Sequence, residues 1–313
     1  MTSNDFAPTF DNAAAYPEVA ALRAAIGARD WAAVRALYDP LGWDARQLLV
    51  FDAADQDGVE RFLREVIERD PEDLVATTMY AVRTVVMGWN VRTTARAKDV
   101  SQRQFEIFFD HLRQAEEALM WVCARDPGNV VAWCERVVTA RALQLGQSEA
   151  RRRYDRLVEQ VPHYLPAQTQ LLQQLCPKWS GDFATMHAFA RQCTQDAPGG
   201  AHNGMLVVDG HVEHWLDLEP GQDAEYLASE EVKADIRAAG ERSVLHPDFQ
   251  HTAGWVRTVS MLALGYSLIG DWSLAKRCFM ELGPYADLRG WGYLGGGAAQ
   301  AFVRYRSTAL ERG

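Results

Sequence analysis

The stretch that decides the fold reads MLALGYSLIGDWSLAKRCFMELGP and spans residues 261–284. Its small and large apolar residues recur mostly three to five positions apart on both sides of Gly270, which is the spacing of a helical face. They are Leu262, Ala263, Tyr266, Gly270, Ala275, Phe279 and Leu282. Glycine commonly ends a helix, and proline cannot continue one. The stretch therefore predicts two antiparallel helices that are joined at Gly270 and stopped at Pro284.

The same arrangement recurs before three other prolines of the sequence. Residues 132–162 repeat it, with Gly146 between the two expected helices and a stop at Pro162. Two further stretches lead into their prolines with one shared spacing of four, three and five positions. They are Ala115, Leu119, Val122 and Pro127, and Met186, Ala190, Cys193 and Pro198. A recurrence of this kind predicts a succession of helical hairpins.

These residues resemble the tetratricopeptide repeat, in which small residues lie where two helices cross, an aromatic residue follows and a proline ends the unit. The resemblance covers about residues 20–290, and residues 178–191 also look like segments of uncharacterised bacterial proteins of this kind. It implies an all-α protein with an α-α superhelix, a solenoid of about six helical hairpins. The repeats are expected to be irregular, because Pro162 follows Pro127 by 35 residues whereas Pro127 follows Pro71 by 56.

The sequence also suggests how the chain is divided. Its length of 313 residues would allow two domains, but a helical array can extend past the size of one domain without dividing. Residues 17–313 carry the helical pattern and are expected to form a single helical-repeat domain. Residues 1–16 are polar and contain Pro8, and we expect this segment to be disordered.

Composition excludes several classes of protein. The chain is 48% hydrophobic and 24% charged, which is an ordinary balance for a folded protein with a large core. Its net charge of -10 argues against a nucleic-acid partner, because broad phosphate neutralisation needs a basic face. No apolar run approaches the ~18 residues of a membrane span, and the N-terminus lacks the basic and apolar regions of a signal peptide. We therefore expect a cytoplasmic protein without a membrane partner.

The sequence contains no familiar catalytic or cofactor motif. There is no G-x-S-x-G, no G-x-x-x-x-G-K-[ST], and no G-x-G-x-x-G that opens a βαβ unit. The five cysteines lie far apart in no C-x-x-C pair, which is typical of reduced core thiols rather than of a disulfide framework. The sequence therefore predicts no cofactor and favours a protein that is not an enzyme, with catalysis left open as an alternative.

One histidine-rich segment could still carry chemistry. His211 and His214 are three residues apart in the expected helix 201–218, so one helical face could present both rings. With Asp217 they would make a two-histidine, one-carboxylate metal site, and with a neighbouring acid they could transfer protons. The histidines could also flank the packed face of an amphipathic helix, and the eight acids of residues 209–231 are most simply a solvated helix end and loop. Whether the segment lines a pocket or packs in the core is left open.

The resemblance also points to a binding face. In tetratricopeptide arrays the first helix of each repeat lines the concave side, where an extended peptide can lie. The residues that this implies are Glu135, Arg141, Arg257, Ser260 and Ser267. Trp255 and His251 lie close to Arg257 in sequence and would add aromatic contacts. We therefore expect a scaffold that binds a protein segment or peptide. The alternatives are a metal- or acid/base-dependent enzyme and a small-ligand sensor, both with a pocket near His211 and His214.

Overall fold

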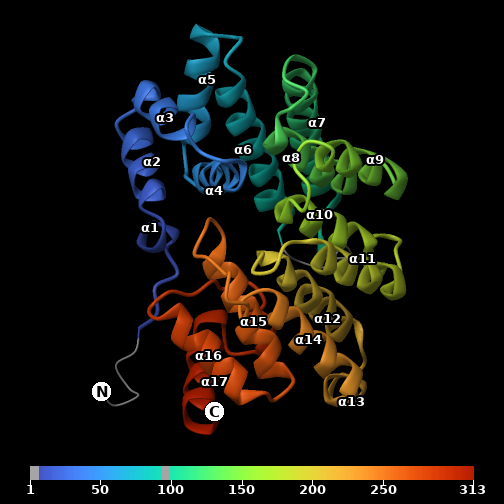
Figure 1. The fold of residues 1–313 in the computed structure, drawn as a ribbon. Helices are drawn as coiled ribbons and strands as arrows, with labels where there is room; N and C mark the ends of the chain where they lie inside the picture. Colours follow the sequence, from blue (N-terminus) through green and yellow to red (C-terminus); the bar gives the residue numbers. More distant parts are fainter. Residues whose placement is uncertain (1–6, 94–98) are drawn as a thin grey trace. The chain divides into compact units, whose positions relative to one another are not determined.

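The regular structure of the chain is helical (Figure 1). The computed structural model describes residues 7–93 and 99–313. Within these two ranges the chain forms seventeen α-helices and three short 3₁₀ helices, and it contains no β-strand. The all-α class predicted from the sequence is therefore confirmed. None of the helices in the described ranges combines the length and the apolar character that a membrane crossing requires.

The chain divides into two compact units. Unit 2 comprises Tyr16–Gln174, and unit 1 comprises Met1–Ala15 together with Leu175–Gly313. Unit 1 thus takes segments from both ends of the chain. The single domain expected over residues 17–313 stays a prediction.

Capping side chains and prolines set the bounds of many helices in unit 2. The helices are α2 (Pro17–Gly27), α3 (Trp31–Tyr38), α4 (Trp43–Ala54), α5 (Val59–Arg69), α6 (Leu74–Arg92), α7 (Gln102–Arg125), α8 (Val130–Ala142), α9 (Gln147–Val158) and α10 (Leu165–Leu175). The capping side chains are those of Asp30, Asp73, Ser101 and Asn129, and each accepts a hydrogen bond from a backbone N–H of the first turn. α5 and α7 end two residues before Pro71 and Pro127, because the residue before a proline is disfavoured in a helix.

Two long or buried helices organise the core of unit 2. α6 contacts α4, α5 and α7, and α8 contacts α7 and α9. Every residue of α8 is buried, including the charged residues Glu135, Arg136 and Arg141. A helix that is buried all round cannot leave its charges to solvent, so each of these side chains must find a partner inside the protein or remain unsatisfied.

Unit 1 contains the hairpin that the stretch 261–284 predicts. Its helices are α1 (Asn12–Ala15), α11 (Phe183–Asp196), α12 (Met205–Asp217), α13 (Gln222–Ala228), α14 (Glu230–Arg242), α15 (Trp255–Leu268), α16 (Trp272–Leu282) and α17 (Ala298–Arg312). α15 and α16 pack against each other on either side of Gly270, whose φ of 73° is a conformation that glycine adopts readily. Tyr266 and Phe279 from this hairpin are fully buried, together with Trp291 and Phe302.

A close approach between α14 and α15 depends on a glycine. A Cβ atom at Gly240 would lie 1.6 Å from the hydroxyl oxygen of Tyr266. No side chain can be accommodated at this distance, so the absence of one lets α14 lie against the aromatic residue of α15.

The first described residues of the chain pack on the C-terminal part of unit 1, as Figure 1 shows for the blue segment beside α16 and α17. The backbone N–H of Thr9 donates to Pro284 O at 2.8 Å, and the N–H of Ala286 donates to Thr9 O at 2.9 Å. The ring of Phe10 meets that of Phe302 edge-on, with centroids 6.2 Å apart. Of the segment 1–16 that we expected to be disordered, residues 1–6 lie outside the described residues, and residues 7–16 make these contacts and include α1.

The prolines between the helices group some of them in chain order. The groups are α2–α3 before Pro40, α4–α5 before Pro71, α6–α7 before Pro127 and α8–α9 before Pro162 in unit 2, and α12–α14 before Pro247 and α15–α16 before Pro284 in unit 1. The uneven proline spacing has a structural cause in two of these groups. α6 and α7 are 19 and 24 residues long, and α13 is inserted between α12 and α14.

Candidate functional site

Two charged side chains on neighbouring helices of unit 1 carry polar atoms without a partner. Asp209 lies on α12 and Arg257 lies on α15, and these helices pack against each other. Asp209 Oδ2 and Arg257 Nε are both buried, and within the described residues neither atom has a hydrogen-bond partner. Leaving a buried polar group unsatisfied costs about 1–3 kcal/mol, so native proteins rarely do so. The fold therefore supplies polar groups here that it does not use itself.

The pKa values of the two groups reflect their burial. Burial raises the pKa of Asp209 from 3.8 to about 6, because the carboxylate loses hydration and the attraction of Arg257 offsets only part of this loss. Burial lowers the pKa of Arg257 from 12.5 to about 10, and the nearby charge of Arg289 adds to the effect. At pH 7 both groups are ionised, so the site offers one acceptor and one donor of opposite charge.

This arrangement suits a ligand that carries both a donor and an acceptor. A carboxylate accepts hydrogen bonds only, and a guanidinium donates them only. A peptide group of an extended chain can donate its N–H to Asp209 and accept from Arg257 at its carbonyl oxygen. Hydrogen bonds to ionised groups are stronger than neutral ones, so a ligand held by both side chains would be held firmly.

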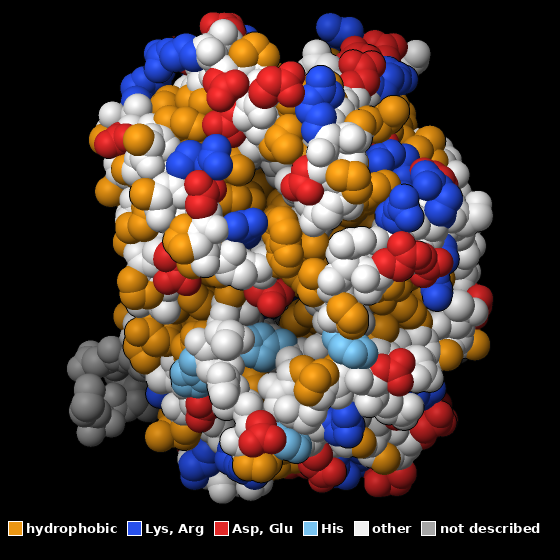
Figure 2. Space-filling view, turned by 45° about the horizontal axis from the view of Figure 1, so that its top comes forward, with side chains coloured by type: hydrophobic (Ala, Val, Ile, Leu, Met, Phe, Trp, Pro, Cys, Tyr) orange, Lys and Arg blue, Asp and Glu red, His pale blue; other side chains and the backbone are white. Residues whose placement is uncertain are grey.

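His251 and Trp255, the two aromatic residues expected near Arg257, contact each other. The ring of His251 stacks on the indole of Trp255, with centroids 3.8 Å apart and an interplanar angle of 8°. His251 Nε2 also lies 2.6 Å from Glu281 Oε1. Trp255 is buried whereas His251 is exposed, and histidine side chains (pale blue) are visible on the face that Figure 2 shows. Residues two apart on a helix point to different sides, so Trp255 and Arg257 do not face one ligand together.

The two serines of the expected binding face are hydrogen-bonded inside unit 1. Ser260 Oγ donates to the backbone oxygen of Asp287 at 3.0 Å and accepts from Trp291 Nε1 at 3.0 Å. Ser267 Oγ donates to Ala263 O at 2.7 Å, one turn earlier on α15. Ser267 also lines a cavity of about 480 Å³ that Trp215 and Tyr305 border. Both hydroxyls therefore have structural partners already.

Glu135 and Arg141 lie on α8, in unit 2, and the structure gives them different surroundings. Arg141 is satisfied, because its Nη1 and Nη2 donate to the backbone and side-chain oxygens of Gln170 at 2.7 and 2.9 Å. Glu135 Oε2 is buried and has no hydrogen-bond partner within the described residues. Burial raises the pKa of Glu135 from 4.5 to about 7, although the charge of Arg141 opposes the shift.

The histidine-rich segment forms a chain of hydrogen bonds across α12, α13 and α14. His211 Nε2 lies 3.2 Å from Asp235 Oδ2, and His211 Nδ1 lies 2.6 Å from the hydroxyl oxygen of Tyr226. Arg191 on α11 also pairs with Asp235, at 2.6 Å. An ionised Asp235 accepts only, so His211 donates to it from Nε2 and accepts from Tyr226 at Nδ1. The result is a continuous path for a proton from Tyr226 to Asp235.

A second histidine pair adjoins this path. His187 on α11 lies with its Nε2 3.0 Å from His214 Nδ1 and 3.4 Å from the Tyr226 hydroxyl. The ring of His214 stacks on Phe183 with centroids 3.9 Å apart. The sequence pattern indicated His211 and His214 only. The clustering of histidines in the sequence could have added His187. No spacing in the sequence relates Tyr226 or Asp235 to His211 or His214.

The charges around the histidines set their protonation. Burial is the main cause that lowers the pKa of His187 from 6.5 to about 3, and the charge of Arg191 adds to the effect. The pKa of His214 is also lowered, chiefly by burial. Burial opposes ionisation of Asp235, but hydrogen bonds from His211 and Arg191 outweigh it and lower the pKa of Asp235 to about 2. At pH 7 the His187–His214 pair is therefore neutral and Asp235 is ionised.

The metal alternative at His211, His214 and Asp217 requires the three side chains to converge. Asp217 is exposed at the end of α12, and both ring nitrogens of His211 are engaged by Tyr226 and Asp235. Across residues 7–93 and 99–313 no three His, Cys, Asp or Glu side chains are grouped so as to hold a metal ion. The residues present do not fit a metal centre.

No protein-family model matches the chain, and no curated protein matches it closely enough to be a relative. The function therefore has to follow from the geometry of the residues themselves.

Proposed function

We propose that the protein is a tetratricopeptide-like scaffold that binds an extended segment of a partner protein at Asp209 and Arg257. The observation that carries the proposal is the unsatisfied pair of buried atoms, Asp209 Oδ2 and Arg257 Nε. The two residues lie on α12 and α15, which are the first helices of consecutive pairs. In helical-repeat arrays such first helices line the inner, ligand-binding side.

The contacts between helices support a repeat architecture. In unit 2 the first helices of successive pairs contact one another in the order α2, α4, α6 and α8, and in unit 1 α12 contacts α15. Each second helix α5, α7 and α14 also contacts the first helix of the next pair. Nearest-neighbour stacking of this kind is typical of solenoids. The superhelix of about six helical hairpins that the sequence predicts is part of the proposal.

The partner is expected to present its main chain to the site. An extended peptide has unpaired N–H and C=O groups along its length, and Asp209 and Arg257 together can satisfy one of each. Both side chains are partly exposed although these two atoms are buried, so a rotamer change would bring the atoms to the peptide, and the new hydrogen bonds would satisfy groups that have already lost their hydration.

A display library of random short peptides tests the proposal. The wild type is expected to enrich a set of peptides whose affinity falls at least about tenfold in Arg257→Gln, because one hydrogen bond to a charged group contributes about 1.5–3 kcal/mol. Arg277→Gln is the matched control, since Arg277 is exposed on α16. Enrichment of no peptide by the wild type, or equal binding by all three proteins, would contradict the proposal.

A second candidate function is acid/base catalysis at the path from Tyr226 through His211 to Asp235. The observation in its favour is that the short contacts join three groups that can move a proton. Incubation of metabolite mixtures with wild type and with His211→Gln, followed by NMR, tests it. Consumption of a compound by the wild type alone supports catalysis, and unchanged mixtures in both samples argue against it.

A further inference from the structure

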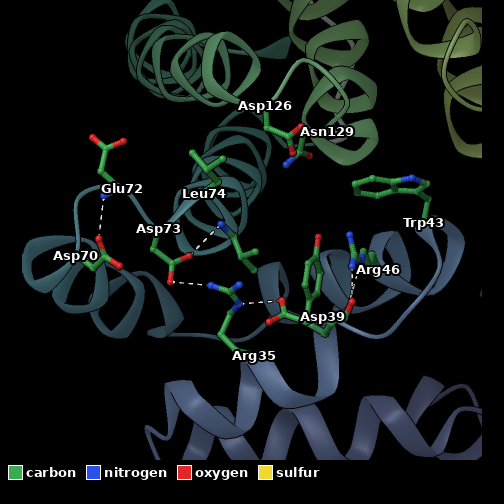
Figure 3. Close-up of a pocket in the computed structure, with 12 residues that line it drawn as sticks. Arg35, Asp39, Trp43, Arg46, Asp70, Glu72, Asp73, Leu74, Asp126 and Asn129 are labelled. Atoms are coloured by element: carbon green, nitrogen blue, oxygen red, sulfur yellow. Dashed lines mark hydrogen bonds and ion pairs between the residues drawn. The ribbon is translucent and has the colours of Figure 1, made fainter.

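Unit 2 contains a polar pocket with a cavity volume of about 420 Å³ (Figure 3). Its walls come from α3, from α4, from the turn between α5 and α6, and from the turn between α7 and α8. The two turns contain the Asp-Pro sequences at Pro71 and Pro127. The pocket therefore lies where successive helical pairs of this unit meet.

The pocket carries an excess of negative charge. Five carboxylates and two guanidinium groups line it. Arg35 pairs with Asp39 at 2.9 Å and with Asp73 at 3.2 Å, so one cation serves two acids. Asp70 and Asp126 accept only backbone N–H groups, and no ion pair neutralises either of them in the part of the chain that the structure describes. The pocket thus attracts a cation.

Two buried polar side chains line the pocket with unused hydrogen-bonding groups. Tyr38 is 3% exposed, and its hydroxyl makes no hydrogen bond with any described residue. Asn129 is 6% exposed, and its Oδ1 caps α8 by accepting from Ala132 N at 3.0 Å, while its amide nitrogen has no acceptor among the described residues. Neither the Tyr38 hydroxyl nor the Asn129 amide nitrogen is among the buried polar atoms that lack a partner, so both groups open into the pocket, where a ligand can accept hydrogen bonds from them.

The protonation of Tyr38 keeps it a donor. Burial raises its pKa to about 12, while the charge of Arg46 opposes the shift. The guanidinium of Arg46 lies over the rings of Trp43 and Tyr38, at 4.7 and 5.1 Å from their centroids. Arg46 also donates from Nε to Tyr38 O at 3.3 Å. These contacts hold the wall of the pocket in place beneath Asp126 and Asn129, as Figure 3 shows.

We propose that this pocket binds an arginine or lysine residue of a peptide. The cationic group pairs with Asp126, and the backbone carbonyl of the same residue accepts from Tyr38 and Asn129. In this arrangement the carboxylate of Asp126 pairs with the cation of the ligand, and the donors of Tyr38 and Asn129 share the carbonyl oxygen of the ligand as their acceptor. The site is independent of Asp209 and Arg257, so it adds a recognition element to the scaffold and does not depend on the peptide-binding role proposed above.

Binding of small model compounds to the full-length protein tests the charge requirement. We expect N-acetylarginine N-methylamide to bind in isothermal titration calorimetry, and the uncharged citrulline analogue to bind about tenfold more weakly or not at all. Agmatine, which has the guanidinium but no backbone carbonyl, distinguishes a free cation from a peptide residue and is expected to bind more weakly than the arginine compound. No binding of the arginine compound, or binding of either other compound as tightly as the arginine compound, would overturn the proposal.

Three variants test the residues. Asp126→Asn keeps the side-chain oxygen that accepts from Gly128 N, and it should weaken the arginine compound about tenfold. Tyr38→Phe should weaken the same compound several-fold and leave the affinity for agmatine unchanged. Asp110→Asn is the control, because Asp110 is exposed on α7. The substitution removes the same charge at a different place on unit 2. Circular dichroism checks that all three remain folded, and an equal loss in Asp110→Asn and Asp126→Asn would refute a local site.

Discussion

Glu116 in unit 2 and Asp209 in unit 1 are two carboxylates that the fold treats in opposite ways. Glu116 Oε1 accepts from Arg136 Nε and Nη2 at 3.2 and 3.1 Å. Its Oε2 accepts from Thr139 Oγ1 at 2.5 Å and from Arg153 Nη1 at 3.0 Å. Asp209 Oδ2 has no partner in the described chain, although Arg257 is near enough to act on its pKa.

The contrast separates a group that stabilises the fold from a group that is kept available. The fold surrounds Glu116 with donors on both oxygens, so the helices α7, α8 and α9 are tied together by one carboxylate. No such donor contacts Asp209 Oδ2 within the described residues. A buried polar atom without a partner adds nothing to stability, and the proposed ligand would supply that partner.

The largest effect is expected at Glu116. Glu116→Gln should lower the free energy of unfolding by about 3–5 kcal/mol, because Arg136 would remain buried without a counter-charge and Arg153 would keep only its pair with Glu149. Urea denaturation measures this change in the transition of unit 2. Glu117→Gln is the matched control, since Glu117 is the exposed neighbour on α7. A loss below 1 kcal/mol would show that Glu116 is not a group that stabilises the fold.

A pH-dependent effect of intermediate size is expected at Glu135. The pKa of Glu135 is raised from 4.5 in the unfolded chain to about 7, so the folded state binds its proton more tightly. Its contribution to stability is therefore complete below pH 4.5 and decreases as the pH rises to 7, by up to about 3 kcal/mol. In Glu135→Gln this decrease should be absent, which urea denaturation at pH 4, 6 and 8 would measure. Parallel pH profiles for variant and wild type would show that Glu135 is not held protonated.

A smaller effect is expected at Arg257. Arg257→Gln should change the free energy of unfolding by less than about 1 kcal/mol, because its buried Nε has no hydrogen bond to lose and the lost attraction to Asp209 is offset by relief of the repulsion from Arg289. The same variant should lose peptide binding, so stability and binding separate at this residue. Thermal denaturation measures the first property. A decrease above 3 kcal/mol would place Arg257 with Glu116 among the structural groups.

The smallest effect is expected at an exposed ion pair. Arg151 Nε and Asp155 Oδ1 lie 2.8 Å apart on the surface of α9, and both side chains are more than half exposed. Asp155→Asn should lower stability by less than about 0.5 kcal/mol, because exposed pairs are screened by solvent. Urea denaturation at low and high salt checks this value. A larger loss would mean that an exposed pair of opposite charges stabilises the fold as a buried pair does. It would then weaken the contrast between satisfied and unsatisfied buried groups.

The local features of the fold could be predicted from the sequence. The spacing of apolar residues around Gly270 gave the helices α15 and α16, because each residue in that pattern acts on neighbours a few positions away. The insertion of α13 could not be predicted in this way. Its residues are within the acidic run 209–231, which suggested a solvated helix end and loop, and Tyr226 is directed to His211 only by the packing of α13 on α12.

The candidate site could be predicted only in part. The sequence predicts Arg257 from its expected position on the first helix of a repeat, and in the structure Arg257 lies near an acid with an unsatisfied oxygen. That acid, Asp209, could not be selected among eight, because which carboxylate is buried depends on the contact between α12 and α15. Ser260 and Ser267 lie on the same helix as Arg257, but the hydrogen bonds that occupy them involve tertiary contacts and the preceding turn.

The pairing of Thr9 with Pro284 and Ala286 has a consequence for how the protein is made. The segment that contains Thr9 is translated before unit 2, and the residues that it pairs with are translated after unit 2. During synthesis unit 2 can complete all of its internal contacts while the beginning of unit 1 has nothing to pair with. Unit 1 can therefore close only after Ala286 has been translated, and a chain truncated before Pro284 would carry a folded unit 2 and an open unit 1.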